Sequence, residues 1–287
     1  MVNLILILTV TFWGLSFIAT KMALDYLNPF EIIAIRLILG VPVLYLVLKF
    51  KRIKPTINKN DIWRITIASL VLGIHFIIQA TGLIYTSATN TAWLIATIPA
   101  FIAVASYIFL KEKLTGLKIG GIAIASAGVI LLVSHGNLNN LDWLKSVGDW
   151  IILSSCFTWV IYTILIKNLT GRYNPLSLSF IIFLIPTILL AVFILISSPI
   201  ARFTSLPVSI ILLMVVHGVL FMGIAHWFWN YGLSRKGATE VGVYLYFEPV
   251  VTTVAAAPIL GERITPILII GALLIILGVY LVECKLK

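Results

Sequence analysis

An internal repeat constrains this sequence more than any other feature. Residues 82–132 align without a gap to residues 232–282 at a constant offset of 150, with 15 identities in 51 positions. Earlier in each half the offset is 146, and the aligned pairs are Trp13 and Trp159, Lys21 and Lys167, and Asn28-Pro29 and Asn174-Pro175. The repeated unit is too long for a solenoid, whose period is ~20–50 residues. We therefore divide the chain into two similar halves, residues 1–141 and 142–287.

The composition indicates a membrane protein. Hydrophobic residues make up 61% of the chain, charged residues 10%, and the mean hydropathy is +1.13, whereas soluble domains carry about 25% charged residues. The apolar runs are continuous, which favours helices of ~20 residues over barrel strands. We predict spans at about 3–21, 30–48, 64–84, 90–110, 117–134, 149–167, 175–197, 208–232, 238–259 and 266–283.

Basic residues are divided unequally between the two sets of expected loops. Fifteen lie on the side of the termini and four on the opposite side, namely Lys21, Lys145, Arg202 and Arg263. Cytoplasmic loops are rich in Lys and Arg, so the pattern predicts an inner-membrane protein with both termini in the cytoplasm. The formal charge of +10 therefore records topology, and we expect the lipid bilayer, not nucleic acid, as the partner.

The odd number of spans in each half decides how the halves are related. Five spans bring the chain to the opposite side, so the second half enters the membrane in the reverse sense. The predicted fold class is an all-α membrane protein with ten transmembrane helices in two inverted five-helix repeats around a central cavity. Two such halves can exchange conformations and expose the cavity to one side at a time.

Glu248 is the clearest candidate functional residue, because an acidic side chain at mid-bilayer costs at least ~2.5–3.5 kcal/mol on insertion scales. Its spacing of four from Tyr244 predicts that the two share a helical face, with Glu240 and Thr252 on the same stripe. Pro249, like its repeat partner Pro99, permits a kink. Glu248 either binds a substrate ammonium group or coupling proton, or is a structural carboxylic acid hydrogen-bonded to a neighbouring helix.

Further polar and aromatic residues recur at similar depths in the expected spans. Two pairs at i, i+4 place His75 with Gln79 and His226 with Asn230, and His75 is a second proton-coupling candidate. His217 is expected to point elsewhere. The aromatic set and its polar neighbours are Trp13, Ser16, Asn90, Trp93, Trp159 and Tyr162. All of these are candidate substrate-binding residues; the structural alternatives are hydrogen-bonded core histidines and tryptophans anchored at the membrane interface.

Arg36 lies in the second expected span. We interpret it as extending toward Glu31 or Asp25 at the membrane surface, with the cavity mouth as the alternative. Cys156 and Cys284 are not expected to pair, and the sequence holds no Cys/His metal-ligand pattern. No metal or cofactor is predicted.

Both halves contain Pro-x10-Leu-x-Glu-x2-Thr followed by a glycine-containing helix. We expect Thr115 and Thr265 to N-cap the following helices, and Glu112 and Glu262 to stabilise their own turns. The glycines suit close packing of the fifth and tenth spans. With the strings Phe12-Trp13-Gly14-x-Ser16 and Phe247-Glu248-Pro249, these motifs resemble the drug/metabolite transporter superfamily, EamA-type branch, over essentially the whole chain.

That resemblance implies a basket-like bundle with spans 1, 3, 4, 6, 8 and 9 around a central cavity and spans 5 and 10 at the periphery. Relatives of this type often export amino acids and related metabolites. We predict a secondary transporter, acting as a monomer or homodimer, that exports such small molecules by alternating access with proton coupling as one driving force. No Walker A motif suggests ATP coupling. The alternatives are export of lipophilic or quaternary cations and, less favoured, an intramembrane enzyme.

Overall fold

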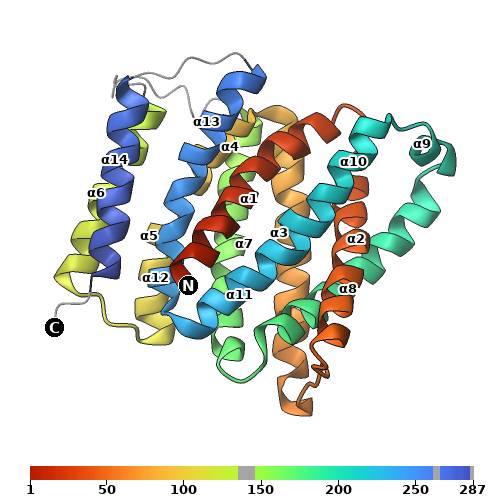
Figure 1. The fold of residues 1–287 in the computed structure, drawn as a ribbon, viewed down its shortest axis with the longest axis horizontal. Coiled ribbons are helices and arrows are strands. Elements are labelled where there is room, and N and C mark those ends of the chain that lie inside the picture. Colours follow the sequence, from red (N-terminus) through yellow and green to blue (C-terminus); the bar gives the residue numbers. More distant parts are fainter. Residues whose placement is uncertain (135–145, 261–265, 285–287) are drawn as a thin grey trace.

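The computed structural model describes residues 1–134, 146–260 and 266–284, which form helices joined by short turns, with no β-strand among them (Figure 1). The first half contains α1 (Val2–Ala23), α2 (Pro29–Phe50), η1 (Lys59–Asp61), α3 (Ile62–Tyr85), α4 (Ala88–Ile95), α5 (Ile98–Ala105), η2 (Ser106–Leu110) and α6 (Gly116–Val133). The second half contains α7 (Val147–Thr170), α8 (Pro175–Ser197), α9 (Ile200–Thr204), α10 (Val208–Val216), η4 (His217–Ile224), α11 (Ala225–Arg235), α12 (Ala238–Gly242), η5 (Val243–Phe247), α13 (Glu248–Leu260) and α14 (Pro266–Glu283). The all-helical prediction is confirmed for this part of the chain. The expectations for Lys145, Glu262, Arg263 and Thr265 fall outside it.

The helices have the length and surface of membrane spans. Among the described residues, seven helical runs are long and apolar enough to cross a bilayer, namely Val2–Ala23, Pro29–Phe50, Lys59–Tyr85, Ala88–Leu110, Val147–Thr170, Pro175–Ser197 and Val208–Arg235. Large apolar side chains cover the outside; Leu195 and Ile196 are 77% and 82% exposed. Such a surface requires lipid, because water would make it aggregate. The chain is a multi-pass membrane protein, and the count of ten spans stays a prediction.

Local sequence explains where several helices begin. The Asn28 side chain accepts a hydrogen bond from the Glu31 backbone N–H, and the Glu31 carboxylate accepts one from the Asn28 N–H, at 3.0 and 2.8 Å. Ser146 and Asp149 form the same reciprocal cap at the start of α7. These caps satisfy backbone donors that the first helical turn leaves unpaired. Pro29 occupies a first-turn position of α2, where no backbone donor is needed.

Three of the expected spans are not uniform α-helices. The run that includes α4 and α5 is interrupted at Ala96 and Thr97, just before Pro99. In the second half, the 3₁₀ segment η5 separates α12 from α13, and Pro249 lies in the first turn of α13. Between α10 and α11 the chain forms the π-helical segment η4. Such interruptions rotate the following side chains relative to a continuous helix, and they are common at functional sites.

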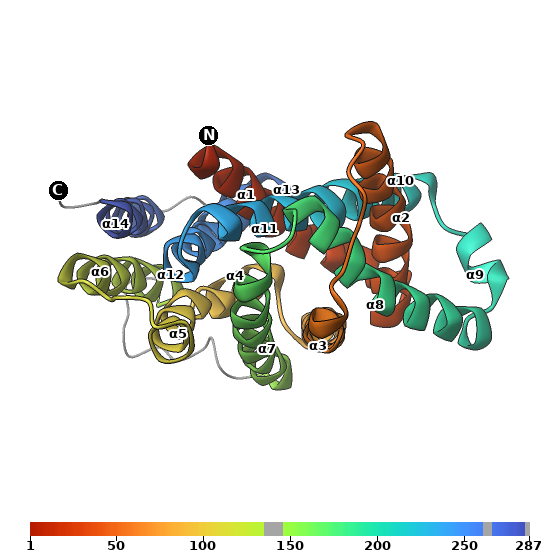
Figure 2. The same cartoon turned by 90° about the horizontal axis from the view of Figure 1, so that it is seen from below.

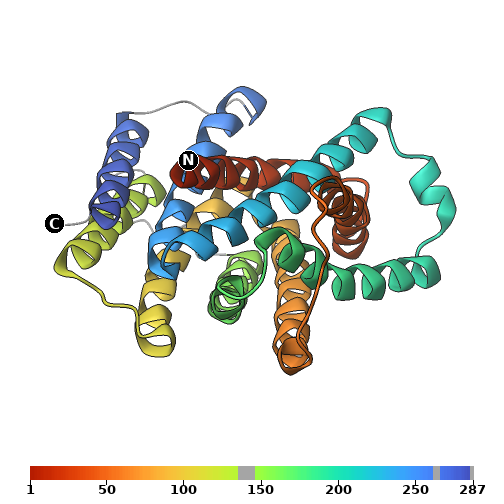
Figure 3. The same ribbon diagram turned by 60° about the horizontal axis from the view of Figure 1, so that its bottom comes forward.

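Helices α6 and α14 pack along each other at one edge of the molecule, and α9 lies at the opposite edge (Figures 1, 2 and 3). The backbones of α6 and α14 approach closely at glycines. A Cβ atom on Gly121 would lie 2.6 Å from the Gly278 carbonyl oxygen, and one on Gly128 would lie 2.7 Å from the Gly271 oxygen. The predicted close packing between these helices is therefore confirmed. The pair lies at the periphery of the bundle, as the resemblance implies, and its inner side packs on η5.

Two lysines that are equivalent in the repeat each connect a pair of helices, one pair in each half. Lys21, near the end of α1, donates to the carbonyl oxygens of Leu83 and Thr86 at 2.7 and 2.8 Å, where α3 ends. Lys167, near the end of α7, donates to the oxygens of Leu233 and Lys236, both at 2.6 Å, where α11 ends. In each case a lysine cation binds carbonyls at the negative end of a helix dipole. The sequence alignment pairs these lysines but does not predict their partners.

Glu112 corrects one prediction. Its carboxylate accepts hydrogen bonds from the backbone N–H groups of Ala238 and Thr239, at 2.6 and 3.1 Å, so it caps α12 across the two halves and does not stabilise only its own turn. A negative group is favoured at that positive helix end. The Thr115 hydroxyl accepts from the Lys118 backbone N–H at 3.4 Å, as an N-capping residue of α6 does.

Candidate functional site

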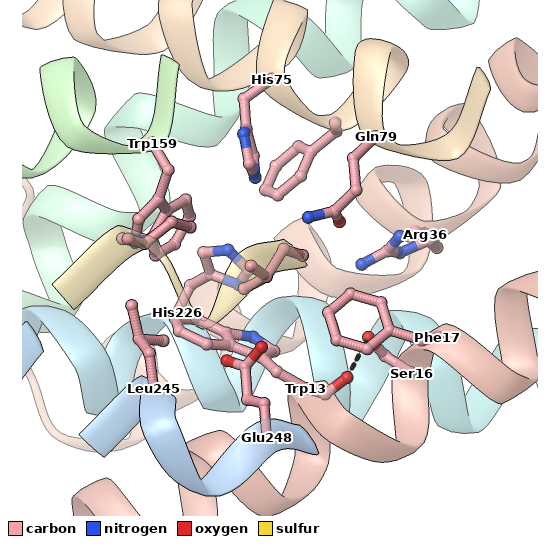
Figure 4. A pocket seen from close by; sticks show the side chains of 13 residues that line it. Trp13, Ser16, Phe17, Arg36, His75, Gln79, Trp159, His226, Leu245 and Glu248 are labelled. Carbon is pink, nitrogen blue, oxygen red and sulfur yellow. Dashed lines mark hydrogen bonds between the residues drawn. The ribbon is translucent and has the colours of Figure 1, made fainter. Parts of the chain in front are cut away.

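A buried cavity lies between helices of both halves (Figure 4). Its volume is about 30 Å³, which leaves room only for water-sized occupants. It is lined by Trp13, Ser16, Phe17, Arg36, His75, Phe76, Gln79, Ile95, Ile98, Trp159, His226, Leu245 and Glu248. Seven of the candidate binding residues predicted from the sequence are in this set: Trp13, Ser16, His75, Gln79, Trp159, His226 and Glu248.

The interrupted runs form one wall of the cavity. Ile95 and Ile98 flank the break between α4 and α5, and Leu245 and Glu248 lie at the junction of η5 with α13. Thr252, one turn beyond Glu248, donates to the Gly14 carbonyl oxygen at 2.9 Å and so attaches α13 to α1. The breaks therefore put the Glu248 carboxyl group beside backbone that is not continuous α-helix, as in discontinuous transporter helices.

The environment of Glu248 is unusually poor in partners. The residue is 2% exposed, and no hydrogen bond or ion pair connects its carboxyl group to another residue in the described part of the chain. Taking a carboxylate out of water without compensation is costly. A buried carboxyl group that faces a cavity and has no protein partner is therefore available to a ligand or a proton.

The expected polar stripe along the ninth span is wrong for Glu240 and Tyr244, which precede Glu248, while Thr252 is buried one helical turn beyond it. Glu240 forms an ion pair with Lys118 at 3.0 Å, outside the cavity, and Thr252 contacts α1. Tyr244 is buried at 2% exposure but does not line the cavity. The reason is the 3₁₀ segment η5, which has about 3.0 residues per turn instead of 3.6. A spacing of four across it no longer returns to the same face.

The two cavity histidines are held by hydrogen bonds from one ring nitrogen. His75 Nδ1 lies 3.0 Å from the Ser155 carbonyl oxygen and 3.0 Å from the Thr158 hydroxyl. His226 Nδ1 lies 2.9 Å from the Met222 carbonyl oxygen. Because a carbonyl only accepts, Nδ1 carries the proton in both rings, and Nε2 of each neutral ring remains an acceptor. His226 Nε2 is buried without a partner in the described residues.

Aromatic rings form a continuous cluster beside these histidines. The Trp13 ring lies 5.0 Å from Trp159, 5.2 Å from Trp229 and 4.9 Å from His226, measured between centroids. The Trp13 indole N–H donates to the Phe221 carbonyl oxygen at 3.1 Å, which fixes the ring. Edge and tilted arrangements of this kind are favourable. The sequence pointed to Trp13 and Trp159; Trp229, fully buried within the cluster, is a residue that the sequence analysis missed.

Five candidate residues lie outside the cavity lining. Tyr162 donates to the Asn230 side-chain oxygen at 3.3 Å, and the Asn230 amide donates to the Ser179 hydroxyl at 2.8 Å. This cluster joins α7, α8 and α11. The Asn90 amide donates to the Asp149 carboxylate at 2.6 Å at the start of α7. Trp93, on α4, and Tyr244, on η5, complete the set. His217 also faces away from the cavity and lies 2.8 Å from the Thr20 hydroxyl.

Arg36 corrects a second prediction, because it lines the cavity and is only 4% exposed. Its guanidinium group lies over the Phe76 ring, 5.6 Å from the centroid. Glu31, the partner expected from the sequence, pairs instead with Arg202 at 3.0 Å. The sequence contained a signal for the cavity position of Arg36, because an arginine seven residues into an apolar span must extend to the membrane surface or face a protected interior.

Ionisable side chains around a cavity inside an apolar bundle define a helical membrane protein with a polar interior cavity. The model of the EamA-like transporter family matches residues 1–134 and 146–284. The chain belongs to the EamA-like transporter family and is therefore a membrane transporter. The two matched segments fall on either side of the division inferred from the repeat.

Similar proteins span the whole chain. A protein of Archaeoglobus fulgidus named an uncharacterized transporter is 30% identical over 284 residues, covering 99% of this chain and 97% of its own. The uncharacterized transporter YyaM of Bacillus subtilis is 30% identical over 281 residues, covering 93% and 88%. One crystal structure superposes with a TM-score of 0.76 at 19% identity, covering 98% of this chain and 95% of the other, which shows that the fold is shared.

Proposed function

We propose that the protein is a secondary transporter that exports amino acids or related small polar metabolites by alternating access. The observation that carries this proposal is the closed central cavity, in which Glu248 is buried without a protein partner. A cavity of about 30 Å³ cannot admit such a substrate, so the described conformation corresponds to a closed state between openings. Discontinuous helices beside the cavity are the elements that would change.

The proposed architecture is two inverted five-helix repeats with ten spans in the inner membrane, working on a small-molecule substrate as a monomer or homodimer. The lysine contacts support an internal two-fold relation. Lys21 and Lys167 are equivalent in sequence, and each binds carbonyl oxygens at the end of a helix that lies two spans later in the chain. Asn3 on α1 also donates to Glu283 on α14 at 3.5 Å, so the two termini share one end of the bundle. The basic asymmetry makes that end cytoplasmic.

Proton coupling follows from the setting of Glu248. Removal from water favours the neutral carboxylic acid, and a neighbouring positive charge favours the carboxylate. A substrate ammonium group that enters the cavity would therefore displace a proton from this side chain. A reversal of that exchange when the cavity opens to the other side couples substrate export to a proton gradient.

The decisive experiment measures transport in proteoliposomes with an imposed pH gradient. We expect the wild-type protein to move at least one labelled amino acid or related metabolite faster when protons can flow in the opposite direction. Glu248→Gln should insert and fold but lose this proton dependence. Glu240→Gln is the matched control, because Glu240 pairs with Lys118 outside the cavity; it should keep the dependence. A Glu248→Gln protein with unchanged rate and pH dependence would show that the coupling group lies elsewhere, with His75 the next candidate.

A second candidate function is export of lipophilic or quaternary cations. The aromatic cluster favours it, since Trp13 and Trp159 lie 5.0 Å apart beside a carboxyl group, and aromatic faces attract cations. Cells that overproduce the protein would then resist cationic dyes. Resistance to amino-acid analogues without dye resistance would reject this candidate.

A further inference from the structure

Arg36 presents the strongest unexplained feature of the cavity. It is 4% exposed, and no hydrogen bond or ion pair within the described ranges involves its guanidinium group. The Phe76 ring, at 5.6 Å, is the aromatic contact that holds it. A positive charge that is buried away from bulk water without a protein acceptor is destabilising, and a purely structural arginine would be expected to have an acceptor in the protein.

The surroundings of Arg36 suit an anionic group of a ligand. A guanidinium group offers five N–H donors and no acceptor, in a planar fork that matches a carboxylate. Figure 4 shows the Gln79 side chain beside Arg36 at one side of the cavity, and Gln79 makes no hydrogen bond within the described residues. Its amide can add one further donor. No carboxylate of the described residues pairs with Arg36.

Glu248 supplies an acidic group in the same cavity. Arg36 and Glu248 both line it but do not form an ion pair with each other. In Figure 4 the Glu248 carboxyl group lies beside Trp13, away from Gln79. A cavity with one unpaired cation and one carboxyl group that can release a proton suits a ligand that carries both charges, because the ligand carboxylate pairs with Arg36 and the ligand ammonium group pairs with the carboxylate that remains when Glu248 loses its proton.

We infer that the cavity selects zwitterions, with the substrate carboxylate bound by Arg36 and its ammonium group by Glu248. This inference rests on the proposed function and names its substrate class: α-amino acids and similar small molecules with both groups free. It also decides against the cation candidate. The Arg36 charge repels a ligand that is only a cation, and the low-dielectric surroundings strengthen that repulsion.

The inference is tested by binding to purified protein in nanodiscs at constant pH. Four matched probes are compared for each side chain: the amino acid, its amide, the amine without a carboxylate, and the carboxylic acid without an amine. The wild-type protein should bind the amino acid at least tenfold more tightly than the other three. Arg36→Gln should weaken amino-acid binding at least tenfold and leave amide binding unchanged, and Arg36→Lys should retain part of the preference.

Glu248→Gln should give the reverse pattern, with weakened amino-acid binding and unchanged binding of the carboxylic acid. Arg235→Gln is the matched control, since Arg235 is exposed on α11, and it should behave like the wild type. Circular dichroism and elution as a single species verify that each variant is folded. The probe comparison on the wild-type protein needs no variant, so a variant that fails to fold does not leave the inference untested.

The outcomes separate this inference from the proposed function. Equal wild-type affinity for the amino acid and its amide, or an Arg36→Gln protein that keeps the preference, would overturn the zwitterion site while leaving transport intact. Binding of carboxylic acids through Arg36, without binding or transport of any amino acid, would overturn both the zwitterion site and amino-acid export.

Discussion

Two adjacent glycines on α6 give opposite predictions for the same substitution. A Cβ atom on Gly121 would lie 2.6 Å from the Gly278 carbonyl oxygen and 2.8 Å from Val282 Cγ2, whereas a Cβ on Gly120 would meet nothing within 4 Å. Replacement of either glycine by alanine removes backbone freedom from the unfolded state, which stabilises a helix by about 0.5–1 kcal/mol. Only Gly121→Ala also forces the α6 and α14 backbones apart.

The steric cost of Gly121→Ala follows from that backbone contact. A carbonyl oxygen at 2.6 Å cannot rotate away as a flexible side chain does, so the two helices must separate along their length. Overpacking of this kind costs about 1–3 kcal/mol. Because the gain in helix preference is common to both variants, the difference between their free energies of unfolding gives the steric cost at Gly121. We expect Gly121→Ala to be less stable than Gly120→Ala by about 1–3 kcal/mol.

The assay is unfolding in mixed micelles titrated with sodium dodecyl sulfate, followed by tryptophan fluorescence and circular dichroism and checked for reversal by dilution. Gly116→Ala adds a second control, because a Cβ there also meets nothing within 4 Å. Midpoints of Gly120→Ala and Gly116→Ala should equal or exceed that of the wild type. If Gly121→Ala shifts the midpoint in the same direction and by the same amount, the close α6–α14 contact does not govern stability and the reasoning fails.

Two further predictions concern contacts at the ends of the helices. Glu112→Ala should lower stability by about 2–3 kcal/mol in the same titration, because two backbone N–H groups of α12 lose a charged acceptor; an unchanged midpoint would show that water replaces the cap. Lys21→Met should increase thiol-reagent access to a cysteine placed at Ala88 about tenfold or more, and Lys167→Met should do so at Ala238, in a background without Cys156 and Cys284. Both alanines are buried, and each lies two residues after a carbonyl that the lysine binds. Equal effects of each variant at both ends would contradict separate roles.

Local chemistry allowed much of the helical layout to be predicted. Continuous apolar runs cannot satisfy their backbone in lipid except as helices, and Asn28-Pro29 and Asn174-Pro175 mark helix starts through caps formed within three residues. The expected spans accordingly agree with the observed helices to within a few residues. Glu248 was also identifiable from sequence alone, because the cost of burying an acidic group makes its presence in an apolar run informative.

Which face of a helix points inward could not be predicted with the same success. In lipid both faces are apolar, so the amphipathic pattern that orients a helix in water is weak. Arg36 shows the consequence: its position within an apolar run was clear, but only the packing of α2 against its neighbours turned it into the cavity. The prediction for Tyr244 was wrong for a related reason, since the 3₁₀ segment η5 rotates this side chain away from the face of Glu248.

Contacts between distant parts of the chain depended entirely on tertiary structure. Glu112 is separated by more than a hundred residues from the α12 backbone it caps, and Lys167 likewise binds carbonyls of a distant helix end. Sequence determined that these residues are charged, that they recur in both halves, and that the chain repeats. The tertiary structure decided their partners, because a charge near the end of an apolar helix binds whichever unpaired backbone groups the neighbouring helix presents.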